Sequence, residues 1–427
     1  AQAVTDVIKS VVNQEGVIRA QAMEERNGVV VLSGGNEGIV SVSGTIDASG
    51  TDAGEKGGTV HVLGEKVGLF DHANINVSGD ASGGTALIGG DFQGTGTVLR
   101  SSATYMSSDS MVTADAINSG NGGKVIFWSD GYTNVHGTIY ARGGAQSGDG
   151  GLIETSGHHI LDARGIRGGV TAPNGKGGAW LFDPDSNVAI TTSASSGGGF
   201  TTNTWAPTAD NSNILNTDLN ALLTGGTTVT VTTTNGTGTQ TGNITVTDAI
   251  TAAGAGTLVL SAGTGGTANS VITVNAAITG QSAALPLNVT LNANGAGGGG
   301  SVTFGAGTGS IDTKGGNVIV NSSTTVLLGA INTGTGGTLT VTAGGAVTQN
   351  GVLTIGGAAT FAAGSGNNIT LASANAFSTV TIASGSNVTL NDTNTLDLAA
   401  STVSGTLTVT TAGNLTQSGI VTVAGAA

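Results

Sequence analysis

The sequence predicts an all-β fold in which the chain winds into a parallel β-solenoid, and two repeat patterns support this prediction. In the first half, a hydrophobic residue, a turn, a Gly-Gly pair and a short strand recur. The second glycines of these pairs are Gly58, Gly84, Gly123, Gly151 and Gly178. Recurrence at roughly 20–50 residues is typical of stacked repeats. In the second half, short strands alternate apolar residues with Thr, as in residues 228–231, which predicts one inward and one outward face.

The composition excludes several other classes of protein. Glycine accounts for 76 of the 427 residues, but only 4 are proline and no triplet period is present, which excludes collagen. A hydrophobic content of 38% argues against disorder. The net charge of −14 argues against a nucleic-acid partner. No apolar run approaches the ~20 residues of a membrane span, and we expect no cofactor.

The first half should contain one helix, a run of strands and one irregular segment. Residues 3–13 follow the spacing of one helical face and predict a short amphipathic helix. Strands begin near Gly16 and recur to about residue 185. The largest departure from the repeat is Gln93–Ala114, which lengthens the interval between Gly84 and Gly123, so we expect this segment to project from the stack as a loop or irregular coil.

The chain should divide into three stretches. Residues 1–185 form a more charged, Gly-rich β-helix with repeats of ~27 residues, since eleven of the 12 Lys and Arg residues lie there. Residues 186–226 form a boundary, in which 191–202 is a linker or long loop. Residues 214–223 form a second short helix with Gly225 as its C-cap. Residues 227–427 form a nearly uncharged β-helix of Val-Thr-Val-type repeats.

Several segments resemble one family of bacterial surface proteins. They are VVNQEGVIRA (11–20), VSGTIDASG (42–50), GGTVHVLG (57–64), GGLIETSGH (150–158), WLFDP (180–184) and the segment 214–232. In these segments the chain is similar to the filamentous-haemagglutinin-type exoproteins, which are large adhesins of Gram-negative two-partner secretion systems. The resemblance implies a right-handed parallel β-helix, an outer-membrane transporter partner during secretion, and a secreted or cell-surface location. The family's N-terminal secretion domain is not visible, so we expect a downstream segment or a processed product.

Aromatic residues supply the candidate contact sites. They gather near residues 127–140 and 180, with others in or beside the irregular segments. The candidates are Phe92, Tyr105, Trp128, Tyr132, Tyr140, Trp180 and Trp205. Such side chains could stack on sugars. The alternative is that they fill the coil interior or close the boundary between the two halves.

Histidines and carboxylates do not predict a metal or catalytic site. His158 and His159 lie near Glu154 and Asp162, but adjacent strand residues point to opposite faces, so the two histidines should not share an ion. Six carboxylates occupy turns at equivalent repeat positions, which is typical of solvated turn residues. These are Asp47, Asp52, Glu55, Asp80, Asp149 and Asp162. We therefore expect no enzyme.

The function that these observations favour is the structural shaft of a secreted filamentous adhesin that mediates attachment, aggregation or biofilm matrix formation. Host-cell or matrix glycans and proteins are the expected partners. One alternative is an extracellular filament subunit that assembles with itself. Another is a carbohydrate-binding or carbohydrate-active β-helix, which would need a groove lined by aromatics and carboxylates.

Overall fold

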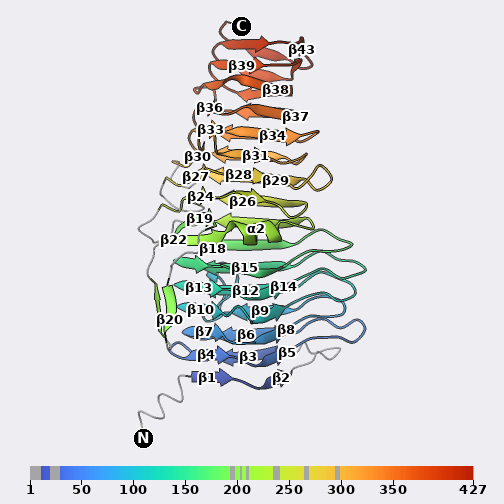
Figure 1. Ribbon diagram of the computed structural model, residues 1–427, viewed down its shortest axis with the longest axis vertical. Helices are drawn as coiled ribbons and strands as arrows, with labels where there is room; N and C mark the ends of the chain where they lie inside the picture. Colours follow the sequence, from blue (N-terminus) through green and yellow to red (C-terminus); the bar gives the residue numbers. More distant parts are fainter. Residues whose placement is uncertain are drawn as a thin grey trace. The chain divides into compact units, whose positions relative to one another are not determined.

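The computed structural model describes residues 11–19, 29–192, 198–201, 204–207, 211–233, 241–263, 269–293 and 299–426. Its residues divide into two compact units. The first contains residues 1–186 and 193–231, and the second contains residues 187–192 and 232–427. Both units are parallel β-helices, which confirms the fold class that the sequence predicts (Figure 1).

Each coil of the first unit contributes strands to three rows. The first row is β1 (Val11–Gln14), β4 (Ile39–Val42), β7 (Lys66–Leu69), β10 (Ala103–Met106), β13 (Tyr132–Val135), β16 (Ile160–Asp162) and β22 (Asn211–Leu215). The second is β2 (Val17–Arg19), β5 (Thr45–Asp47), β8 (Asn74–Asn76), β11 (Met111–Thr113), β14 (Thr138–Tyr140) and β17 (Arg167–Gly169). The third is β3 (Val29–Ser33), β6 (Thr59–Leu63), β9 (Thr85–Ile88), β12 (Lys124–Ser129), β15 (Leu152–Gly157), β18 (Ala179–Pro184) and β23 (Thr227–Thr232).

The second unit repeats this plan, and its coils shorten along the chain. Its first row holds β19 (Asn187–Thr191), β24 (Ile244–Val246), β27 (Val271–Val274), β30 (Ser301–Phe304), β33 (Val326–Leu328) and β36 (Val347–Gln349). The second row holds β25 (Ile250–Thr251), β28 (Ala277–Thr279), β31 (Ser310–Asp312) and β34 (Ala330–Gly334). The third row holds β26 (Gly256–Ser261), β29 (Leu287–Ala293), β32 (Val318–Ser322) and β35 (Leu339–Ala343). Two long strands, β37 (Leu353–Ala362) and β38 (Ile369–Ser384), cross from one row to the next. The last two coils are β39 (Val388–Asp392), β40 (Leu396–Leu398), β41 (Ser401–Val403), β42 (Leu407–Thr411), β43 (Leu415–Gln417) and β44 (Val421–Val423).

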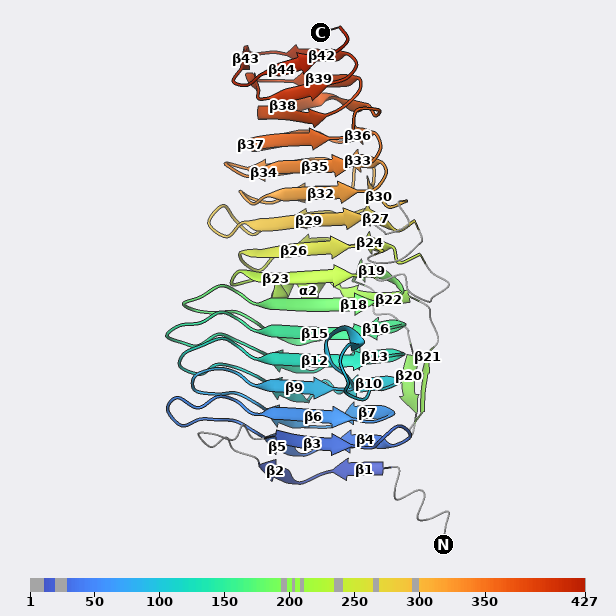
Figure 2. The same cartoon turned by 180° about the vertical axis from the view of Figure 1, so that it is seen from behind.

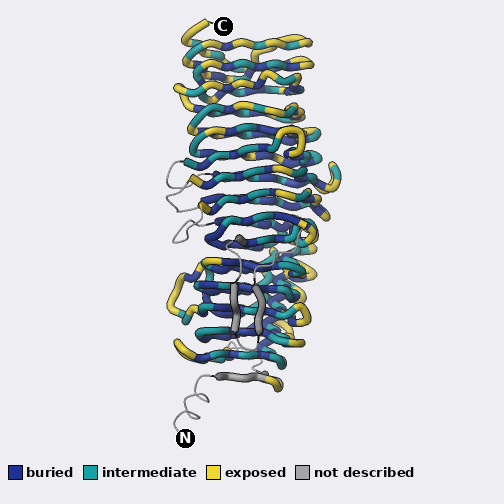
Figure 3. The backbone as a smooth tube through the Cα atoms, turned by 60° about the vertical axis from the view of Figure 1, so that its left-hand side comes forward, coloured by how far each residue is buried: buried dark blue, intermediate teal, exposed yellow. Residues whose placement is uncertain are grey.

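In-register stacking buries the same side-chain type in successive coils. In the second row of the first unit, Ile46 pairs with Ile75, Ile75 with Val112, and Val112 with Ile139. All four are fully buried. Along β29, buried and half-buried residues alternate without exception, and Figure 3 shows this alternation along the coils. The apolar alternation in the sequence therefore builds the continuous interior of each unit.

Asparagine ladders mark the turns of the second unit and show how its coils shorten. The side-chain oxygen of Asn243 accepts the amide of Val271, 28 residues on. Farther along, Asn387 receives the same bond from Thr406 over only 19 residues. The side-chain acceptor satisfies a turn amide that has no strand partner.

Four expectations about local structure need correction. Residues 3–10 of the predicted first helix lie outside the described residues, and residues 11–13 belong to β1, which pairs with β4. The second helix, α2, spans only Asn216–Leu222, because Ile214 and Leu215 continue β22. Its C-cap is Leu223, not Gly225.

The other two corrections concern predicted loops. Within 93–114, residues 103–106 and 111–113 are regular strands of the stack. Within 191–202, Thr191 ends β19, and β20 (Gly198–Thr201) pairs antiparallel with β21 (Thr204–Pro207). Short strands in Gly- and Ser-rich sequence look like loops, because backbone pairing rather than side-chain pattern defines them.

Candidate functional site

The first candidate site lies on the outer face of the third row of the first unit, where a loop covers the strands. This insertion loop, Gly89–Ser101, follows β9 and contains the short 3-10 helix η1 (Phe92–Gly94). The amide of Ser101 donates to the carbonyl of Gly89 at 2.7 Å, so the two ends of the loop meet, as in an Ω-loop. Figure 2 shows the loop as a blue-cyan curl in front of β12.

The loop packs on an apolar cluster that would otherwise face solvent. Leu87, Ile126 and Trp128 point away from the coil interior, yet they are 3%, 0% and 7% exposed. Phe92 and Val98 of the loop pack against them. As a result, outward positions that are only half buried in other strands are buried in β12 and β15.

Two carboxyl groups are buried beneath the same loop. Glu154 of β15 is 0% exposed and Asp183 of β18 is 5% exposed. Both occupy outward positions, because Ile153, Trp180 and Phe182 fill the interior. The amide of Gln93 donates to Glu154 at 3.0 Å from Oε2 and 3.2 Å from Oε1. The loop thus contacts both members of this carboxyl pair, Glu154 through the Gln93 amide and Asp183 through the Gln93 side chain.

Burial sets the protonation of the carboxyl pair. Burial raises the pKa of Glu154 to about 7, although hydrogen bonds from Gln93 and Ser156 oppose the shift. Burial also raises the pKa of Asp183 to about 7, and the negative charge of Asp185 adds to the shift. A low-dielectric environment disfavours the charged form of a carboxyl group. Near neutral pH these groups could give or take a proton, which a solvated carboxylate cannot do.

Ion pairs surround the carboxyl pair and fix the loop to the sheet. Lys124 Nζ lies 2.7 Å from Asp91 Oδ1, and Arg100 Nε lies 3.1 Å from Asp130 Oδ2. The Arg100 guanidinium also donates to the carbonyl of Gly94 at 3.0 Å.

A third close pair lies beyond the loop, where His158 Nε2 is 2.6 Å from Asp185 Oδ2. Asp185, whose charge raises the pKa of Asp183, is therefore itself engaged with His158.

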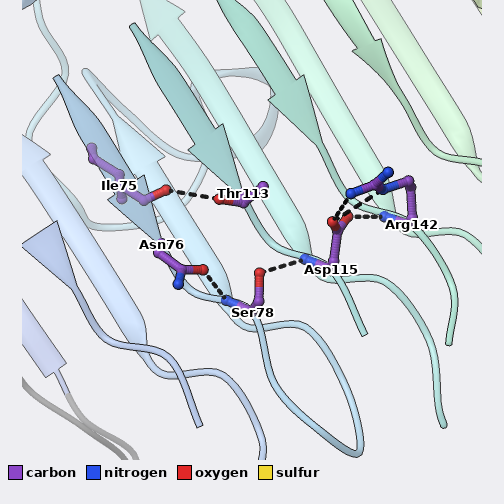
Figure 4. Close-up of polar contacts among 6 residues, drawn as sticks. All are labelled: Ile75, Asn76, Ser78, Thr113, Asp115 and Arg142. Carbon is purple, nitrogen blue, oxygen red and sulfur yellow. Dashed lines mark hydrogen bonds and ion pairs between the residues drawn. The ribbon is translucent and has the colours of Figure 1, made fainter. Parts of the chain in front are cut away.

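A second candidate site follows the turns next to the second row, where polar side chains connect three coils (Figure 4). Asn76 accepts the amide of Ser78 at 3.0 Å, and Ser78 Oγ accepts the amide of Asp115 at 3.2 Å. Asp115 in turn accepts the amide of Arg142 at 2.7 Å and its guanidinium at 2.6 and 3.0 Å. Arg142 also lies 4.2 Å above the ring of Tyr140. Because the Arg142 charge is compensated by Asp115, this ladder stabilises the turns rather than leaving an open anion site.

A shallow hollow of about 430 Å³ lies beside this ladder. It is lined by Asp115, Ala116, Ile117, Arg142, Gly143, Ala145, Thr171 and Pro173. Apart from one compensated ion pair and Thr171, the lining residues are apolar or glycine.

Among the candidate side chains that the structure describes, Phe92 and Trp128 are the two that it brings together. Phe92 and Trp128 meet in the apolar cluster under and within the insertion loop. Tyr105 lies on the first row, with its ring 5.2 Å from that of Phe70, and Tyr132 is half-buried on the neighbouring strand of that row. Tyr140 is half-buried on the second row.

Two other candidates have different positions. Trp180 fills the interior, fully buried and stacked on Phe182 at 5.9 Å, so it cannot contact a ligand. Trp205 belongs to β21, and its side chain lies outside the described residues. Phe92 and Trp128 therefore form one site, and the other described candidates do not belong to it.

The carboxyl pair is what sequence reasoning missed, although the sequence contains one signal for it. Glu154 and Asp183 occupy alternate positions to buried Ile153 and Phe182 and so look like solvated outward residues. The signal is the long interval after β9, because its extra residues had to pack somewhere on the stack. Asp80 and Asp162, expected to be solvated, are 8% and 2% exposed because each is held by neighbouring turn groups.

The expectation that His158 and His159 point to opposite faces is wrong, because they lie in the bend between β15 and β16, where their rings stack 5.6 Å apart. Across the part of the chain that the structure describes, no group of three or more His, Asp or Glu residues could hold a metal ion.

Comparison with known proteins identifies a repeat family in the C-terminal coils. The family is described as "Repeats of unknown function (DUF5649)" and matches residues 315–384 and 385–427. No curated protein matches the chain. Among the described residues, no helix is long and apolar enough to cross a membrane. The chain is therefore a repeat protein with a parallel β-solenoid fold.

Proposed function

We propose that this chain is a structural shaft of a secreted filamentous adhesin, exported through an outer-membrane transporter and located at the bacterial cell surface. In this role it acts without catalysis and carries contact regions away from the cell. The observation that supports the proposal best is the in-register stacking of coils in each unit. The resemblance in the first half of the sequence supports the export route and the location.

Stacking gives such a shaft its stiffness. Each coil bonds through its backbone to the coils before and after it, as Lys124–Ser129 does with β9 on one side and β15 on the other. Main-chain hydrogen bonds contribute about 1 kcal/mol each, and a row of them must break together if adjacent coils separate. The buried interior adds a second cohesive contribution at every coil.

A self-assembling filament subunit is the second candidate, and exposed apolar side chains favour it. On the outer face of β3, Val29 and Val31 are 57% and 55% exposed. In the last described coil, Leu415 and Ile420 are 49% and 79% exposed. Apolar strand surfaces of this kind promote association between chains.

Electron microscopy of the purified chain over a hundredfold concentration range distinguishes the two candidates. A shaft predicts discrete particles of one length at every concentration, whereas a filament subunit predicts continuous fibres that lengthen as concentration rises. Beads coated with the chain should then be tested for attachment to host cells and to each other. Continuous fibres would reject the shaft proposal, and turnover of a polysaccharide by the soluble chain would reject a role without catalysis.

A further inference from the structure

We propose that the insertion loop, Gly89–Ser101, is a pH-gated cover on the outer face of β12, β15 and β18. It stays closed while Glu154 and Asp183 hold their protons, and it opens when both ionise. Opening uncovers the apolar cluster of Leu87, Ile126 and Trp128. This inference does not depend on the proposed adhesive role.

The loop is built to lie flat on the sheet. A Cβ atom at Gly94 would lie 2.5 Å from Trp128 Cζ2, and one at Gly90 would lie 2.6 Å from Trp128 Cδ1. Only glycine allows the backbone to approach the indole so closely. Loop backbone therefore lies directly against the indole, beside the side-chain contacts of Phe92 and Val98.

The backbone of the loop is also under strain. Gln93 adopts φ 51°, in the left-handed region that residues other than glycine rarely occupy. Gly94 and Gly96 on the same loop have φ 61° and 80°. Such a conformation persists only where surrounding contacts hold it, and the contact at Gln93 is its hydrogen bond to Glu154.

Among the described residues, no ion pair joins a cationic side chain to either member of the carboxyl pair. Glu154 and Asp183 come from adjacent, hydrogen-bonded strands, and Ser156 of β15 is the register partner of Asp183. Asp183 Oδ1 is buried without a hydrogen-bond partner. Ionisation of both groups would place two like charges together beneath the loop, away from water.

The charged and titratable groups around the pair come from every neighbouring element. The loop contributes Asp91 and Arg100, β6 contributes His61, and β12 with its following turn contributes Lys124 and Asp130. The turn after β15 contributes His158, and Asp185 follows β18. Burial lowers the pKa of His61, which therefore stays uncharged near neutrality. Burial raises the pKa of Asp91, but hydrogen bonds from Lys124 and Phe92 and the positive charge of Lys124 leave it below its ordinary value, so the Asp91–Lys124 pair persists across the range.

The sign of the pH dependence follows from proton binding. With the loop closed, Glu154 and Asp183 titrate near 7, whereas in an open, hydrated state they would titrate near 4.5 and 3.8. Between these values the closed state binds more protons than the open state, so rising pH favours opening. For each pH unit, one group changes the ratio of open to closed state by up to about tenfold, and the pair changes it by up to about 100-fold. The open population should therefore rise between pH 5 and pH 7 and change little above that range.

Cysteine labelling measures this equilibrium directly, because the chain contains no cysteine. In a Leu87→Cys variant the only thiol lies beneath the closed loop. Its labelling rate by a maleimide, corrected for the thiolate fraction, should rise at least tenfold between pH 5 and pH 8. A Ser108→Cys variant, exposed outside the loop, supplies the correction and should show no further change.

The isosteric double change Glu154→Gln with Asp183→Asn should abolish the pH dependence, with slow labelling of the thiol at position 87 throughout. Asp52→Asn, which alters an exposed turn carboxylate, should leave the wild-type profile unchanged. If the double variant does not fold, hydrogen exchange of residues 90–100 in the wild-type chain, relative to strand β38, gives a second measurement. A corrected labelling rate that does not change with pH, or a profile that survives the double change, would overturn the proposal.

Discussion

Gly151→Ala tests whether the glycine pairs of the first unit exist because adjacent coils touch through their backbones. A Cβ atom at Gly151 would lie 2.1 Å from the carbonyl oxygen of Gly123 in the preceding coil and 2.6 Å from the carbonyl carbon of Gly122. The first distance is roughly 1 Å too short for any real contact, so the two coils must separate locally.

The cost can be worked out from the hydrogen bonds at this position. Gly151 donates to Ala141 at 2.8 Å, Leu152 donates to Gly123 at 2.9 Å, and Ala179 donates to Gly151 at 3.0 Å. Weakening or losing these three bonds at about 0.5–1.5 kcal/mol each gives roughly 2–4 kcal/mol. Because the coils are packed on both sides, relaxation can recover only part of this loss.

Hydrogen exchange followed by mass spectrometry is the appropriate assay, because opening of one part of a solenoid need not unfold the rest. Protection of β12, β15 and β18 should fall by about 30- to 1000-fold, since each 1.4 kcal/mol corresponds to tenfold. Gly169→Ala is the matched control, because no atom lies within 4 Å of the added Cβ. If the Gly151→Ala and Gly169→Ala variants both exchange like the wild-type chain, the backbone-contact explanation for the glycine repeats is wrong.

Three further predictions concern buried and paired side chains. Trp180→Ala empties the interior beside Phe182 and should destabilise the first unit by about 3–5 kcal/mol in thermal or urea unfolding; a loss below 1 kcal/mol would contradict its interior placement. Asn375→Ala removes a fully buried amide that accepts the Leu353 amide at 2.9 Å, and should cost the second unit about 2–4 kcal/mol by urea unfolding. The exposed Asn414→Ala change should cost less than about 0.5 kcal/mol, and equal losses at both sites would refute the importance of the buried Asn375 hydrogen bond. Arg142→Ala leaves Asp115 without its guanidinium partner and should cost about 1–2 kcal/mol in the same assay, whereas Arg142→Lys should recover part of it; identical losses would argue against the forked geometry.

The sequence predicted the repeated core because inward positions obey simple rules. A strand residue that must pack inside a coil is apolar, and its neighbours must be able to face out, so the alternation in residues 227–427 identifies strand and face together. The helix near residue 216 was also predictable, since its apolar residues follow helical spacing. The first residue of this helix could not be predicted, because Ile214 also fits the helical spacing but is a buried residue of strand β22.

Segments whose structure depends on distant partners were predicted less well. Residues 103–106 pair with Lys66–Leu69 and Tyr132–Val135, and this pairing rather than their own pattern makes them a strand. Similarly, Val11 and Val12 satisfy both helical and strand spacing, and pairing with β4 decides between them. Aromatic content indicated candidate contacts, but only the coil register distinguishes interior Trp180 from outward Trp128.

Glu154 shows why the candidate site could not be read from the strand that carries it. In isolation the segment Leu152–Gly157 has an ordinary alternation, with a carboxylate at an outward position where a solenoid normally exposes polar groups. Its environment is set by Gln93, which is 61 residues earlier in the chain and reaches it only because the insertion loop folds over two later coils. In regular coils, equivalent outward positions have the same exposure to solvent. An insertion that folds over the stack changes the exposure of those positions in several coils at once. In a stacked fold, the chemistry that differs from the repeat should therefore be sought on the strands that an insertion covers, as well as in the insertion itself.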